Sequence, residues 1–146
     1  MNAYMDRLKE NLEFIYDRNP FVQLLEMRLV QLESGKAVLT MPVVMDKHTN
    51  LHGIAHGGAL ASLADTAMGV ACGTLGSKVV TVDMNINLMQ GARPGGTISA
   101  KAEVLHHGKS TIVVDAGIFS EEGKLLAKSR GTFFVVGRFI EEDELD

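Results

Sequence analysis

The chain opens with apolar residues spaced for one face of a helix and with charged residues between them. These apolar positions are Met5, Leu8, Leu12 and Ile15. The spacing predicts a short amphipathic helix within residues 1–20, which Asn19-Pro20 is expected to end.

Two strand-like runs follow, residues 27–32 and 36–41, and Ser34-Gly35 separates them. A glycine-containing turn between two apolar runs indicates a β-hairpin. Residues 42–51 show neither a helical nor a strand period, and we expect an irregular connection there.

The segment 57–74 is apolar on nearly every side, and its only charged residue is Asp65. This pattern predicts a helix that the rest of the protein covers almost completely. Gly73 and Gly76 are expected to end it.

The second half of the chain alternates with a period of two, as strands do. Four runs separated by glycine-containing turns are predicted strands: residues 79–88, 97–105, 110–119 and 125–136. In the first run, one face is predicted to hold Val80, Val82, Met84, Ile86 and Leu88, and the other Thr81, Asp83, Asn85 and Asn87.

These elements predict one α+β domain over residues 1–146, in which an antiparallel sheet of five to six strands wraps round a long central apolar helix. The acidic residues 141–146 are expected to form a frayed tail.

Composition and charge narrow the functional classes. The formal net charge of -4 argues against a broad nucleic-acid surface, which needs an excess of basic residues. The single cysteine, Cys72, fits a reducing compartment. No apolar run approaches the ~20 residues that span a bilayer, so the expected protein is cytoplasmic.

Two glycines, Gly57 and Gly58, open the predicted central helix. The first amides of a helix are free to donate, and glycine lets a ligand oxygen approach them closely. The pair therefore suits an anion or a polarised carbonyl. The alternative is that the glycines only allow a tight turn.

Asp65 is the strongest candidate for chemistry, because an ionised carboxylate within an apolar helix is costly unless it has partners. The alternative is that it faces a water-filled cleft or caps a loop. It lies eight residues after Gly57, or ~12 Å along a helix. If both act on one substrate, they must come from two chains, as in a two-fold dimer with antiparallel central helices.

Weaker candidates surround this pair. The Thr81 hydroxyl could position a water, or it could simply satisfy the sheet. Asn50 could bind a water or a carbonyl, or it could make a turn. His48, His52 and His56 are spaced four apart, but the glycines among them disfavour a metal-binding helix, and we expect no metal site.

The pattern Asn50…His56-Gly57-Gly58…Asp65 resembles the hotdog-fold thioesterases of the phenylacetate-pathway (PaaI) type. The resemblance runs from about residue 38 to residue 136 and includes the Val-Thr-Val-Asp sequence of residues 80–83. It implies a hotdog fold, a tetramer built as a dimer of dimers, and hydrolysis of acyl- or aryl-acyl-CoA at the dimer interface without a cofactor.

The same resemblance assigns roles to individual residues. It makes Asp65 the general base or the nucleophile and the Gly57 amide the group that polarises the carbonyl, and it implies that Thr81 holds the water. Asn50 and His56 would orient the carbonyl or the water. The residues implied to contact CoA are Asp83, His106, His107, Gly108, Lys109, Ser110 and Thr111, with Lys109 suited to a phosphate.

The sequence is also compatible with two other functions. A hotdog hydratase or dehydratase would need a histidine paired with an acid at the acyl chain, whereas here the acid follows a Gly-Gly helix start. A non-catalytic acyl-CoA-binding module would leave Asp65 without a reason to occupy an apolar helix.

Overall fold

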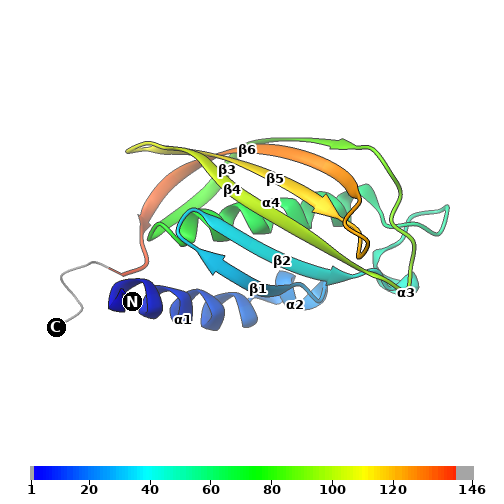
Figure 1. The fold of residues 1–146 in the computed structure, drawn as a ribbon, viewed down its shortest axis with the longest axis horizontal. Coiled ribbons are helices and arrows are strands. Elements are labelled where there is room, and N and C mark those ends of the chain that lie inside the picture. Colours follow the sequence, from blue (N-terminus) through cyan, green and yellow to red (C-terminus); the bar gives the residue numbers. More distant parts are fainter. Residues whose placement is uncertain (1, 141–146) are drawn as a thin grey trace.

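A six-stranded antiparallel sheet curves around one helix (Figure 1). The computed structural model describes residues 2–140, and the predicted frayed tail 141–146 lies outside them. In sheet order the strands are β1 (Arg28–Glu33), β2 (Lys36–Pro42), β4 (Thr97–His107), β5 (Thr111–Phe119), β6 (Leu125–Arg138) and β3 (Ser77–Leu88). The predicted hairpin and the four later strands are confirmed.

The helix inside the sheet is α4 (Gly57–Gly73), as the apolar segment predicts. Its buried residues include Leu63, Ala64, Ala67 and Met68, each fully buried. The helix packs against β2, β3, β4, β5 and β6, so the core lies between it and the concave face of the sheet.

The N-terminal segment forms two helices, α1 (Ala3–Asp17) and α2 (Pro20–Leu24). Asn19-Pro20 follows the end of α1 as predicted, but it also begins α2, because the Asn19 side chain accepts hydrogen bonds from the amides of Phe21 and Val22. α1 buries Leu8 and Leu12 in the core. Figure 1 shows α1 and α2 running along one side of the molecule, beside β1.

The connection predicted as irregular contains a short helix, α3 (Met45–His48). His48 is 1% exposed, and both ring nitrogens meet the backbone: the Val44 amide donates to Nδ1 at 3.0 Å, and Nε2 lies 2.8 Å from the Leu25 carbonyl oxygen. His48 therefore ties the end of α2 to the loop that leads into α4.

The alternation predicted for β3 is wrong at its beginning, because a β-bulge at Val82 shifts the register between Thr81 and Asp83. Thr81 pairs with buried Phe133 and faces α4, on the same side of the sheet as Met84, Ile86 and Leu88. Val80 and Val82 are instead 52% and 64% exposed. An extra residue in one strand reverses the faces on either side of it.

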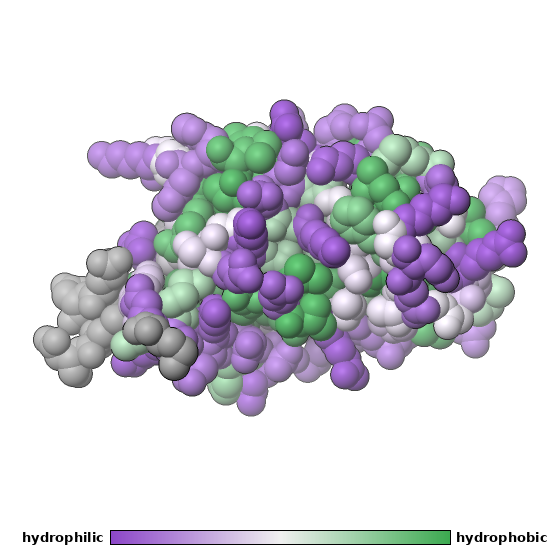
Figure 2. Space-filling model, in the orientation of Figure 1, coloured by the Kyte–Doolittle hydropathy of each residue, from purple (hydrophilic) through white to green (hydrophobic). Residues whose placement is uncertain are grey.

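The surface is mixed in polarity. On the face shown in Figure 2, hydrophobic side chains form separate patches between hydrophilic ones. Within residues 2–140, no helix is both long and apolar enough to cross a membrane.

Candidate active site

Asp65 and Thr81 form one half of the candidate site. Thr81 Oγ1 donates a hydrogen bond of 2.7 Å to Asp65 Oδ1, linking the middle of α4 to β3. The other Asp65 oxygen has no hydrogen-bond partner among residues 2–140, so it can accept a proton or approach a carbonyl carbon.

A cavity of about 500 Å³ opens beside this pair. Asp65 and Thr81 share its lining with Gly69 of α4, Tyr16 of α1 and Phe133 of β6. Burial, followed by the charges of Cys72 and Asp65, raises the pKa of Tyr16 to about 12. The Tyr16 hydroxyl therefore stays neutral at physiological pH, close to the carboxylate.

The N-terminus of α4 forms the second half of the candidate site. The amides of Ala59 and Leu60 donate to the His56 carbonyl, and the Gly58 amide donates to His56 Nδ1 at 2.8 Å. The Gly57 amide has no acceptor in the part of the chain that the structure describes. A free amide at a helix start can stabilise a developing oxyanion.

Asn50 and His56 lie with Gly57 in this second half. The Asn50 side-chain oxygen accepts from the amides of His52 and Ile54 and so shapes the loop before α4. His56 is the N-cap of α4 and is exposed. Both residues therefore have a structural role. Asn50 Nδ2 and His56 Nε2 have no hydrogen-bond partner within residues 2–140 and could contact a substrate.

One chain does not bring the two halves together. Gly57 and Asp65 are eight residues apart on a continuous helix, which separates them by ~12 Å along its axis. They also lie beside different parts of β3: a side chain at Gly57 would lie 2.9 Å from Leu88 Cδ1 at the end of the strand, whereas Asp65 accepts a hydrogen bond from Thr81, seven residues earlier.

The hairpin expected to contact CoA joins β4 to β5 near the Asp65–Thr81 half. Cross-strand pairing runs from Thr81 to Phe133, Ile112 and His107, so His107 lies three strands away in the same row, ~14 Å from Thr81. The Gly108 amide donates to the Thr111 carbonyl and closes the turn. His106, His107, Lys109 and Ser110 are exposed there.

Asp83 lies apart from this group. Because it follows the bulge, it points to the outer face of the sheet, opposite to Thr81. The sequence alternation predicts Asp83 and Thr81 on one face, and the bulge puts them on opposite faces.

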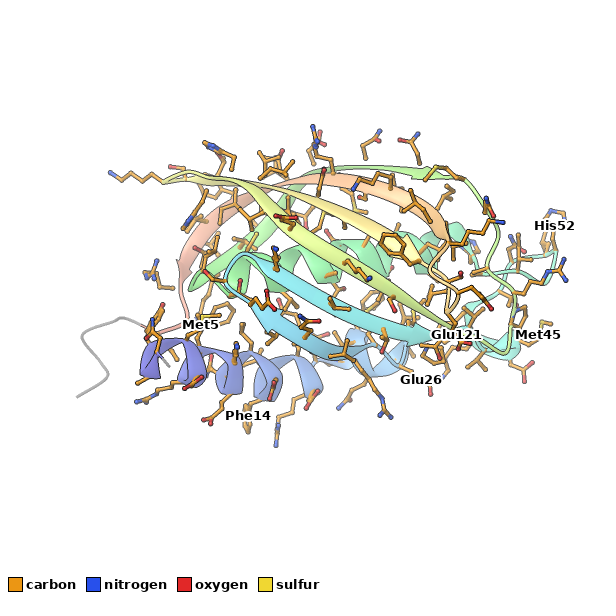
Figure 3. The ribbon with its side chains drawn as sticks, in the orientation of Figure 1. Met5, Phe14, Glu26, Met45, His52 and Glu121 are labelled. Carbon is orange, nitrogen blue, oxygen red and sulfur yellow. The ribbon has the colours of Figure 1, made fainter. Side chains whose placement is uncertain are left out.

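The three histidines at four-residue spacing also separate. His48 is buried with both nitrogens engaged, His56 caps α4, and His52 projects from the outer tip of the loop between α3 and α4 (Figure 3). Within residues 2–140, no three metal-binding side chains cluster.

Comparison with known proteins identifies the family. The model of the thioesterase superfamily matches residues 52–127, and the chain belongs to this superfamily. It is 34% identical to the acyl-coenzyme A thioesterase PaaI of Escherichia coli over 128 residues, which cover 88% of this chain and 91% of that protein. The resemblance to the PaaI type is thereby confirmed, and the protein is a thioester hydrolase.

Solved structures of related proteins support the same family and fold. The Escherichia coli PaaI structure superposes with a TM-score of 0.87 at 32% identity and covers 94% of this chain and 99% of that one. The hotdog fold is therefore confirmed. A Streptococcus mutans protein solved with bound acetyl CoA has a TM-score of 0.75 at 32% identity, covering 78% of this chain and 91% of that one.

Sequence reasoning missed the part of the site that the N-terminal segment supplies. In the sequence, Tyr16 is an ordinary residue of an amphipathic helix. Its position beside Gly69 of α4 becomes visible only in the folded structure. Gly69 carried a usable signal, since it lies four residues after Asp65 and so on the same helical face.

Proposed function

We propose that this thioesterase hydrolyses an acyl- or aryl-acyl-CoA to the free acid and CoA at a site shared by two subunits. The observation that carries the proposal is the distribution of groups along α4: a carboxylate held by Thr81 in its middle and, at its start, a Gly57 amide that has no acceptor among residues 2–140. One subunit supplies Asp65 and Thr81, and its partner supplies Gly57 with Asn50 and His56.

The chemistry follows from these groups. The partner's Gly57 amide donates to the thioester oxygen as it gains negative charge, and losing such a donor typically costs ~10²–10³ in rate. Asp65 takes a proton from a water that attacks the carbonyl carbon. Alternatively, Asp65 attacks directly, and water hydrolyses the resulting anhydride. The C–S bond breaks, and the proton leaves with the thiolate.

The strand β3 provides a surface for the partner. It is 12 residues long, and in the described chain its outer edge pairs with no strand. A long open edge invites pairing with another chain. An antiparallel β3–β3 pair would continue the sheet across a two-fold axis.

The register of that pair can be derived. Thr81 must face Leu88 of the partner subunit, because Leu88 contacts Gly57 in each chain. Bulged Val82 has no pairing partner, so the paired positions from Thr81 to Leu88 are 81, 83, 84, 85, 86, 87 and 88. Asn85 is the middle position and therefore faces Asn85 of the partner subunit. Met84 then faces Ile86, and both point inward, so the faces match. Two such dimers would make the tetramer that the PaaI resemblance implies.

The other assignments fit this reaction. The β4–β5 hairpin offers exposed Lys109 and Ser110 to the CoA phosphates, with His106 and His107 beside them. Asp83 lies three strands away in the cross-strand row of His106, so a contact with CoA would come from the outer face of the sheet. A carboxylate and a peptide amide suffice for hydrolysis, so the reaction requires no cofactor. The buried free thiol of Cys72 fits the reducing cytoplasm.

The direct experiment follows thiol release from CoA esters by the wild-type chain and by Asp65→Asn. We expect turnover by the wild type and a loss of about 10²–10⁴-fold in Asp65→Asn, because the amide cannot accept the proton. A change at an α,β double bond without thiol release would indicate a hydratase. Binding of CoA esters without turnover would indicate a binding module, and full activity in Asp65→Asn would remove this residue from the mechanism.

A further inference from the structure

Gly69 of α4 is not required by close packing against its neighbours. Gly69 lies within a helix of 17 residues, where glycine is less stable than alanine by about 1 kcal/mol. Among residues 2–140, a side-chain carbon at this position would come within 4 Å of the Tyr16 hydroxyl alone, at 3.8 Å, an ordinary van der Waals distance. Neither its backbone conformation nor a neighbouring atom therefore excludes alanine there.

Gly73, one turn further along the same helix, behaves differently. A side-chain carbon there would lie 2.7 Å from Leu12 Cδ2 of α1, so the packing of α1 against α4 accounts for this glycine. Gly69 differs from Gly73 because the space beside it is part of the cavity next to Asp65. The missing side chain at Gly69 therefore enlarges that cavity.

The cavity continues along α4 from the catalytic carboxylate. Asp65 and Gly69 are four residues apart and share one face of the helix, with a rise of ~6 Å between them. Aromatic rings contribute to the cavity wall: Phe133 of β6 pairs with Thr81, the Tyr16 hydroxyl of α1 lies beside Gly69, and Phe139 after β6 lies beside Gly73. The lining as a whole is mixed in polarity, and these rings, with Phe21 and Val22, form its apolar part, which suits an acyl group.

We propose that this cavity holds the acyl group and that Gly69, facing Tyr16, leaves the space through which acyl groups longer than about five carbons pass. An extended alkyl chain advances roughly 1.3 Å per carbon for C–C bonds of ~1.5 Å, so about five carbons cover the rise from Asp65 to Gly69. The substrates are then medium-chain or arylalkanoyl esters. This inference rests on the proposed thioesterase reaction and adds the residue that sets its acyl specificity.

The test compares kcat/KM for octanoyl-CoA and acetyl-CoA in the wild type, Gly69→Ala and Gly69→Leu. In Gly69→Leu we expect the octanoyl-to-acetyl ratio to fall at least about tenfold, since misfitting one or more carbon groups in an apolar pocket changes kcat/KM by ~10–200-fold. In Gly69→Ala the ratio falls less, while the thermal unfolding midpoint rises because the helix gains alanine.

The ratio cancels any general loss of active enzyme, and the unfolding midpoint reports on the fold separately. An unchanged ratio in active Gly69→Leu would overturn the role of Gly69 and leave the thioesterase reaction intact. If the wild type releases thiol from neither ester nor from phenylacetyl-CoA, the proposed reaction itself fails, and this inference fails with it.

Discussion

Thr81 donates a hydrogen bond of 2.7 Å to Asp65 because a bulge at Val82 turns the beginning of β3 toward α4. Without the extra residue, Thr81 would share the outward-facing side with Asn85 and Asn87. The bulge therefore selects which hydroxyl reaches the carboxylate. Bulges often re-aim a side chain beside an active site in this way.

This relationship predicts the effect of Thr81→Val, which removes the hydroxyl and keeps the branched shape. A hydrogen bond to a charged group contributes ~1.5–3 kcal/mol, so we expect kcat to fall about ten- to hundredfold if the bond holds Asp65 in its reactive orientation. Steady-state kinetics measure this loss. Thr81→Ser keeps the hydroxyl and is expected to retain most of the rate; equal losses in both variants would contradict the role of the bond.

The sequence predicted the large elements well, since their apolar periods are strong: the central helix starts at Gly57 as expected, and each later strand begins within two residues of its predicted start. It failed at Val82, because a bulge has no local marker in an unbroken alternation of valine with polar residues. It also missed the cavity wall, since the approach of Tyr16 to Gly69 depends on how α1 packs against α4.

His56 allows its structural and its chemical roles to be separated. Its Nδ1 accepts from the Gly58 amide and caps α4, and loss of a cap costs ~1 kcal/mol. We expect His56→Ala to lower the thermal unfolding midpoint by about 3 °C. His56→Asn retains a capping oxygen and is expected to retain stability while losing activity if His56 also orients the substrate. Full activity in His56→Asn would leave only the capping role.

The β3–β3 register can be tested by disulfide trapping. Facing residues of an antiparallel pair have Cα atoms ~4.5–5.5 Å apart, so Asn85→Cys should link two chains under mild oxidation. The native Cys72 will not interfere, because burial raises the pKa of its thiol to about 12. Non-reducing electrophoresis measures the yield.

Asn87→Cys is the matched control, since Asn87 is exposed on the same face of β3. In the derived register two Asn87 copies lie four paired positions apart, ~13 Å, too far for a disulfide. Efficient linkage through Asn87 and none through Asn85 would show that the register is wrong.

The division of the reaction centre between two chains is best tested by mixing two inactive variants. Asp65→Asn lacks the carboxylate, and Gly57→Val blocks the approach to the amide; each is expected to be inactive alone. When the two are coexpressed in equal amounts, mixed dimers have one site with both native groups, and the preparation should regain about a quarter of wild-type activity. If each chain housed a complete site, mixed dimers would have none intact, and the preparation would stay inactive.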